Sequence, residues 1–476
     1  MRKLIQLSIL ICFISFASCK KNQTATSTNG VYTNTNSNNN GTGGTNGTGG
    51  TTTKVADLTK NVKNISEMIV PDNFNFDNNR LVSINLSLTN NTYSTPHLIS
   101  ICDADPSSTF STISQGSIDV NKPYSAKISL PYTTSKVYVI HKYPNNTSNI
   151  DILSIDANNN VSLNYLSKTN PDIIVGNSAL DFNTNATYIL NKKGTDNDGD
   201  GIPNSLDSYP EDAAKAFNSY FPNDKDYATI MYEDLWPCKG DYDMNDLVVD
   251  LRHQIVTNAI NQVVEVKATY ILRANGGNQP LAFCNVFPVA PSSISNLVGG
   301  TAETSSTESI IQLFNNSYKV LGGMNTLSKQ DKLPEQTINM SFNISSNPKL
   351  ADFTIAEYNP FIWVNSPDKG RGYEIHLPGH LPTNSVDNTM FKYADDATDK
   401  IKNKYFLSKN NLPWGLMIPK SFKYCVELTM TDDGIIPDIT QVYLRFAQWA
   451  QSGGKIYKDW HTEQTDYRNT KYIFNK

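Results

Sequence analysis

A concentration of carboxylates near the middle of the chain limits the folds that are open to this sequence. Between Asp196 and Asp250 there are twelve aspartates and two glutamates, opposed by three lysines. This segment carries a charge of −11, whereas the whole 476-residue chain carries −5. Carboxylates that folding brings together disfavour each other's ionisation. The segment therefore either binds cations or stays fully solvated.

The first part of the segment, DNDGDGIPNSLD at 196–207, has the spacing of a calcium loop. Carboxylates at positions 1, 3 and 5 converge when the chain curls, a glycine at position 6 allows the turn, and position 7 offers a carbonyl. The aspartate at position 12 makes the loop resemble those of thrombospondin type 3 repeats and dockerins. The alternative is a solvated Asp/Gly turn. The expected calcium ligands are Asp196, Asp198, Asp200, the Ile202 carbonyl and Asp207.

A second acidic cluster follows, and we interpret it as a further metal site at the entry to the C-terminal domain. Its acidic and amide residues alternate just before Val248 and Val249, which begin a strand. The alternative is a network of Asx turns that caps this strand without metal. The residues of this second site are Glu233, Asp234, Asp241, Asp243, Asn245 and Asp246.

Most of the remaining chain predicts β-structure. Apolar residues alternate with polar ones at Ile84, Leu86 and Leu88, and Asn-rich turns separate short strands of this kind. The pattern predicts an N-terminal β-sandwich over 56–193. After a calcium-binding connector at 194–212, we expect a larger β-rich domain over 213–476, sandwich- or jelly-roll-like, with one or two packed helices. One helix is expected over 439–450, with a capping box at Asp438 and Gln441.

The N-terminus reads as a lipoprotein signal. Three residues, Met-Arg-Lys, precede an apolar stretch at 4–17, which is the length of a signal core rather than of a membrane span. It ends in Phe16-Ala17-Ser18-Cys19, which resembles a bacterial lipobox except that Phe16 stands where leucine is usual. We therefore expect removal of residues 1–18, acylation of Cys19 and an Asn/Thr/Gly-rich tether over 19–55. The alternative is an ordinary secretory signal that is cut near Ser18.

A longer resemblance concerns 210–476. The segment DLWPCKGDYDMNDLVVD at 234–250 resembles the LruC domain, and EIHLPGH at 374–380, NNLPW at 410–414 and AQWAQSGG at 447–454 continue the match. Cys238 departs from the pattern, which would have a small polar residue there. LruC domains occur in bacterial outer-membrane lipoproteins and have no assigned activity. The resemblance implies a lipid-anchored envelope protein, on a membrane face that stays open, and it assigns no catalytic residues.

Chemistry beyond metal binding is sparse. The motifs of serine hydrolases, zinc proteases and P-loop enzymes are missing, and Pro378-Gly379 prevents His376 and His380 from sharing a helix face. The net charge argues against a nucleic-acid partner. We therefore expect a calcium-stabilised envelope lipoprotein, a non-catalytic binding, adhesion or structural module with a glycan or protein partner. The alternative is a carbohydrate-active enzyme or a glycan-capture protein with its site in the C-terminal domain.

Four cysteines remain after the signal and lipid positions, and the cell envelope permits disulfides. Cys102 belongs to the expected N-terminal domain. We therefore expect Cys284 to pair with either Cys425 or Cys238.

Overall fold

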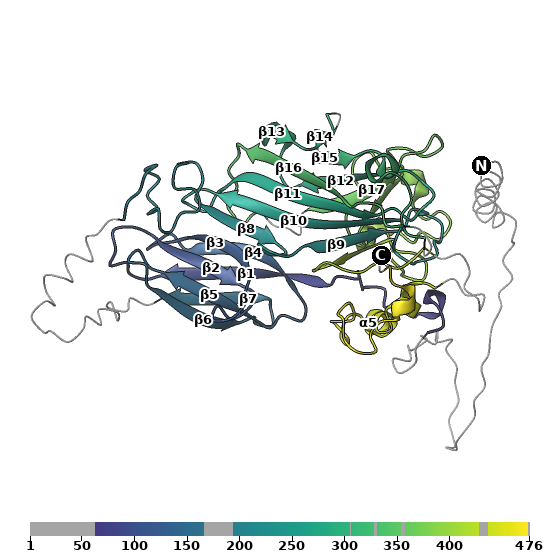
Figure 1. Ribbon diagram of the computed structural model, residues 1–476, viewed down its shortest axis with the longest axis horizontal. Helices are drawn as coiled ribbons and strands as arrows, with labels where there is room; N and C mark the ends of the chain where they lie inside the picture. The colour runs from purple at the N-terminus through teal and green to yellow at the C-terminus, as the bar shows by residue number, and fades with distance from the viewer. Residues whose placement is uncertain are drawn as a thin grey trace, which may run out of the picture. The chain divides into compact units, whose positions relative to one another are not determined.

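The computed structural model describes residues 62–165, 194–304, 306–327, 331–353, 358–427 and 437–474. Residues 58–476 form one compact unit, and residues 1–57 lie outside the described residues. The fold is mainly β, as predicted, and Figure 1 shows its strands. No helix in the described ranges combines the length and the apolar character needed to cross a membrane.

The N-terminal strands form two sheets. One sheet has the order β4-β1-β7, in which β1 runs antiparallel to β4 and parallel to β7. The alternating residues Ile84, Leu86 and Leu88 lie buried on β1, as their pattern predicted. The strands of this part are β1 (Asn79–Leu88), β2 (His97–Cys102), β3 (Thr112–Ile118), β4 (Tyr124–Pro131), β5 (Lys136–Lys142), β6 (Ser148–Ser154) and β7 (Asn160–Tyr165).

The second sheet runs from the N-terminal strands into the C-terminal ones, in the order β13-β16-β11-β10-β8-β3-β2-β5-β6. Its join is narrow, because β3 meets β8 through the pair Ser114 and Ser219, whose hydroxyls lie 2.6 Å apart. The sequence-predicted N-terminal and C-terminal regions therefore share one sheet. The further strands of this sheet are β8 (Phe217–Phe221), β9 (Ala228–Tyr232), β10 (Leu247–Thr257), β11 (Val263–Ala274), β13 (Ile294–Val298), β16 (Gln336–Ile344) and β19 (Gly415–Ile418).

Strand β10 changes its neighbour halfway along its length. Its first five residues pair with β9, and its residues from His253 onward pair with β8. Strand β9 then continues the sheet to β19. The sheet therefore forks at Leu251–His253, and this fork bounds a cavity that is described below.

A third, five-stranded sheet and a few short helices complete the C-terminal part. The sheet has the order β14-β15-β12-β17-β18. Its strands are β12 (Leu281–Phe287), β14 (Thr301–Ala302), β15 (Ser309–Phe314), β17 (Asn359–Val364) and β18 (Glu374–His376), and a short helix, α3 (Ser317–Leu321), follows β15.

The helix expected over 439–450 is divided into α4 (Ile439–Val442) and α5 (Phe446–Gln451). The capping box of Asp438 and Gln441 is present as predicted. Tyr443 leaves the helical conformation because the neighbouring backbone pairs elsewhere, with the Leu444 N–H donating to the Tyr467 carbonyl at 2.9 Å. Local backbone pairing therefore overrides the helical period.

An aromatic core holds the C-terminal segment and the residues before β1 together. Trp449 and Trp460 belong to this core and are at most 2% exposed. Phe76, which precedes β1, contacts Trp449 with ring centroids 5.9 Å apart. The first described residues are therefore part of the C-terminal core.

Candidate metal centres

The loop at 196–207 leaves carboxylate oxygens without partners. Asp198, Asp200 and Asp207 each accept a backbone N–H from the residue two positions on through Oδ1. The other oxygen of each, Oδ2, is buried and has no hydrogen-bond partner. Oxygens of Asp196, Asp198 and Asp200 lie within 4.8 Å of one another. Calcium–oxygen distances of about 2.3–2.6 Å place opposite ligands about 5 Å apart, so these carboxylates fit one ion.

Two glycines and two apolar side chains give the loop its shape. Gly199 and Gly201 have φ angles of 79° and 95°, which residues other than glycine rarely adopt. No atom lies within 4 Å of the position that a Cβ atom would take at either glycine. Ile202 and Leu206 are buried with Phe217 in a small core of their own. This packing fixes one side of the loop.

The electrostatics of this loop also favour a bound cation. The pKa of Asp207 is raised to about 6, first by burial and then by the nearby carboxylates of Asp200 and Asp198. The pKa of Asp200 is raised for the same two reasons. Removing a carboxylate from water without a counter-charge is unfavourable, and a divalent ion would supply that charge.

In the second cluster, a short loop wraps around Glu233. The Glu233 carboxylate accepts the backbone N–H groups of Tyr242 and Met244, at 3.1 and 2.7 Å. Tyr242 and Met244 have positive φ angles, 63° and 59°, so the backbone adopts the left-handed conformation at both positions. In this loop, oxygens of Asp241 and Asp243 lie within 4.8 Å of a Glu233 oxygen. Glu233 and Asp243 are at most 2% exposed, whereas Asp241 opens to solvent and offers an ion an entry path.

Glu427 joins this cluster from a distant part of the chain. Its carboxyl group shares hydrogen bonds with Asp243 and Asn245, and burial with the nearby Asp241 raises its pKa to about 8. Asp241 shares a similar bond with Glu233. A hydrogen bond between two carboxyl groups requires that one of them carries a proton. Without a bound cation, shared protons therefore keep these carboxyl groups in contact. Sequence reasoning missed Glu427 because it stands alone in its segment, without an acidic pattern.

The six predicted residues of the second site fall into two groups. Asp234 and Asp246 lie on the side of Lys369, whose charge lowers the pKa of Asp234 against the raising effect of burial. Gly277 faces both, since a Cβ atom there would lie 2.3 Å from an Asp234 oxygen and 2.7 Å from an Asp246 oxygen. Asp234 therefore has a partial counter-charge from Lys369.

Asn245 connects the two groups. It is fully buried, and its side-chain N–H donates to Asp243 at 2.5 Å, while its Oδ1 has no partner. A buried amide oxygen without a partner is a suitable calcium ligand. The pKa values of Glu233, Asp243 and Asp246 are raised well above their usual range, first by burial and then by one another and by Asp241.

The remaining residues considered from the sequence are cysteines and histidines. Cys284 and Cys425 are free, buried thiols, so the expected pairing of Cys284 is not formed, whereas Cys238 is disulfide-bonded. They belong to different cores, Cys284 on β12 and Cys425 beside the acidic cluster. His376 is buried against Glu374 at 2.9 Å, whereas His380 lines a separate cavity, which agrees with a structural role for this loop. Cys19 lies outside the described residues.

Comparison with known proteins identifies similarity but no activity. Residues 261–461 match the model of a family described as a domain of unknown function, DUF4842. No curated protein matches the sequence. One similar solved structure is described as that of a candidate lipoprotein from Bacteroides ovatus. It is 14% identical, with a TM-score of 0.48, and the match covers 79% of this chain and 99% of that one. Over residues 261–461, the chain is therefore similar to a family without an assigned function.

Proposed function

We propose that this chain is a calcium-stabilised lipoprotein of the bacterial envelope that acts as a non-catalytic binding or structural module. The observation that carries the proposal is the group formed by Glu233, Asp241, Asp243 and Glu427, whose pKa values are raised by burial and by the neighbouring carboxylates. Such a group cannot be fully ionised without a cation. Hard oxygen donors in this number favour calcium.

Calcium would supply positive charge at two places along the same strand. The loop at 196–207 leads into β8, and the Ala216 N–H donates to the Thr257 carbonyl at the end of β10. The second cluster directly precedes Leu247, where β10 begins. The two ions would therefore hold the two ends of β10, and with them the N-terminal strands against the C-terminal ones.

The envelope location rests on the N-terminal signal. An acylated Cys19 would tether the folded unit through the segment at 19–55, since two or more acyl chains give a firm membrane anchor. The resemblances to the LruC domain and to thrombospondin type 3 loops agree with an outer-membrane lipoprotein. Membrane fractionation of the wild type and of Cys19→Ser tests this part. The anchor predicts that the variant leaves the membrane fraction, and an unchanged distribution would contradict it.

Calorimetric calcium titration tests the metal part, with the chain carrying Cys19→Ser so that it remains soluble. Asp198→Ala should remove one site and Asp243→Ala another. Asp212→Ala is the matched control, because this exposed carboxylate of the same segment pairs with Lys215 at 3.5 Å and accepts the Ala214 N–H at 3.2 Å. If the parent protein binds no calcium and a chelator leaves its melting temperature unchanged, the proposal is wrong.

A further inference from the structure

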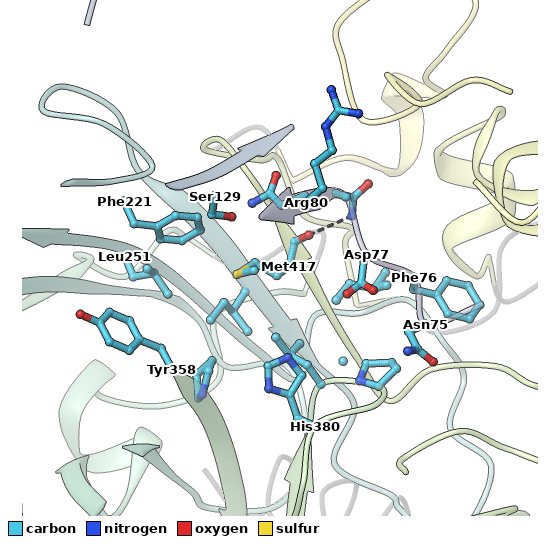
Figure 2. Close-up of a pocket in the computed structure, with 18 of the residues that line it drawn as sticks. Asn75, Phe76, Asp77, Arg80, Ser129, Phe221, Leu251, Tyr358, His380 and Met417 are labelled. Atoms are coloured by element: carbon cyan, nitrogen blue, oxygen red, sulfur yellow. Dashed lines mark hydrogen bonds between the residues drawn. The ribbon is translucent and has the colours of Figure 1, made fainter. Parts of the chain in front are cut away.

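The fork in the large sheet bounds a cavity of about 120 Å³ that neither calcium site uses. It lies where β10 leaves β9 and joins β8, and the segment before β1 closes it from the other side. Figure 2 shows Phe221, Leu251 and Tyr358 on one side of the cavity and Phe76 with Asp77 on the other.

The walls are mostly apolar, with a few polar groups between them. Phe221, Leu251 and Met417 supply flat or flexible apolar surface. Pockets that bind small molecules share this composition, in which apolar walls surround a small number of placed polar groups.

Several of the polar groups have no partner. Both the Nδ2 and the Oδ1 atom of Asn79 are buried without a hydrogen bond. The same holds for His253 Nδ1 and the Tyr358 hydroxyl, on residues that are 2% and 4% exposed. A buried polar atom without a hydrogen bond is unfavourable. A ligand that both donates and accepts at Asn79 would remove part of this cost.

The cavity has little net charge at neutral pH. Burial lowers the pKa of His253 to about 3 and that of His380 to about 4, so both rings are neutral. Asp77, at the opening, has a pKa raised to about 6 by the surrounding protein. The Arg80 guanidinium points away from the other labelled side chains in Figure 2, over the Tyr132 ring at 5.8 Å. Asp77 therefore disfavours anions, and the positive charge of the lining residue Arg80 is directed away from them.

A second hollow of about 370 Å³ adjoins the cavity, and Asn79 and Ser129 line both. The cavity alone is smaller than the engineered cavity of about 150 Å³ that holds benzene. A six-membered ring with hydroxyl groups therefore needs both spaces, with its edge in the cavity and its remainder in the larger hollow. Asn79, at the boundary, is then placed to bind two neighbouring hydroxyls.

We propose that this joined cavity binds one unit of a neutral carbohydrate, with the Asn79 amide as its main polar contact. Hydroxyl groups both donate and accept, which matches the two unpartnered atoms of Asn79, and the apolar face of a sugar ring matches Phe221 and Met417. The inference goes beyond the proposed function and does not depend on bound calcium.

Saturation-transfer NMR and calorimetry on the whole soluble chain test the site with D-glucose, D-galactose, D-mannose and N-acetyl-D-glucosamine. D-glucuronate serves as the anionic comparison. Asn79→Leu fills the boundary between the two hollows, and Asn85→Leu is the control, because Asn85 is exposed on the same strand. Ser129→Leu blocks the same boundary from β4, in case Asn79→Leu fails to fold.

The proposal expects at least one neutral sugar to bind saturably and its Kd to rise at least about tenfold in Asn79→Leu or Ser129→Leu, with no change in Asn85→Leu. Absence of binding by all four sugars at millimolar concentrations overturns it, as does unchanged binding in both blocking variants or tighter binding of glucuronate. The calcium-induced melting shift is recorded on the same samples. A missing sugar site with an intact calcium shift therefore refutes the sugar proposal alone.

Discussion

The substitution Glu427→Gln distinguishes between two roles of this residue, that of a calcium ligand and that of a side chain needed only for packing. The pKa of Glu427 is raised to about 8, so without metal this side chain is mostly protonated at pH 7. Glutamine resembles the protonated acid in shape and polarity. The variant should therefore melt close to the parent in chelator, and the loss should appear only when calcium is present.

The size of that loss follows from linkage. For a site with an affinity typical of extracellular calcium modules, about 10⁻⁴–10⁻³ M, about 10 mM calcium stabilises the folded state by about 1.4–2.7 kcal/mol. The folded unit spans residues 58–476. An unfolding entropy of about 2.1 cal/mol/K per residue then gives about 0.9 kcal/mol/K for its roughly 420 residues. Each site should raise the melting temperature by about 1.5–3 °C, and two sites by about 3–6 °C.

Differential scanning calorimetry in chelator and in calcium measures both quantities. We expect Glu427→Gln to keep the melting temperature in chelator and to lose about half of the calcium-induced shift. Glu463→Gln is the control, because this exposed carboxylate pairs with Arg468 at 2.7 Å, so its effect should be equal in both conditions. Equal destabilisation of Glu427→Gln with and without calcium would refute a metal role for this residue.

Three further predictions follow from the same structure. Gly277→Ala should lower the melting temperature equally in chelator and in calcium, because the added Cβ would lie 2.3 Å from an Asp234 oxygen, and an unchanged melting temperature would refute this. In chelator, the contribution of Glu427 to stability should be complete below about pH 4.3, the unfolded pKa of a glutamate, and should be lost as the pH rises through its raised pKa of about 8. The difference in melting temperature between the parent and Glu427→Gln, followed from pH 5 to 8, checks this sign, and its change with pH should be smaller with calcium. Burial raises the thiol pKa of Cys284 and Cys425, so iodoacetamide should label both only after denaturation, as mass spectrometry would show.

Sequence patterns predicted what is local in this fold. The 196–207 loop needs only its own residues to bring three carboxylates together, and the period of β1 places Ile84 and Leu86 in the core directly. The capping box of Asp438 is also local, and it is present. The helix after it was predicted too long, because the strand-like pairing of Leu444 with Tyr467 involves residues more than twenty positions apart. The periodicity of one segment gives no information about a distant segment that competes for its backbone hydrogen bonds.

The same distinction explains the second cluster. Its residues before β10 were recognisable because they are close in sequence, yet Glu427 and Lys369, which decide its charge balance, come from other elements. Their arrangement depends on how the C-terminal segment returns to the sheet, which no spacing rule describes.

Strand β10 links the three features that carry functional hypotheses. Acidic groups lie at both of its ends, and the cavity lies at its middle, where Leu251 and His253 pair with different neighbours. Its eleven residues have ten steps of about 3.3 Å, which separate the two ends by about 33 Å, too far for direct coupling between the ions. Any effect of calcium on the cavity must therefore pass through the geometry of the strand itself. A strand fixed at both ends has less freedom to open at the fork, so calcium should slow ligand exchange from the cavity more than it changes the ligand's equilibrium affinity.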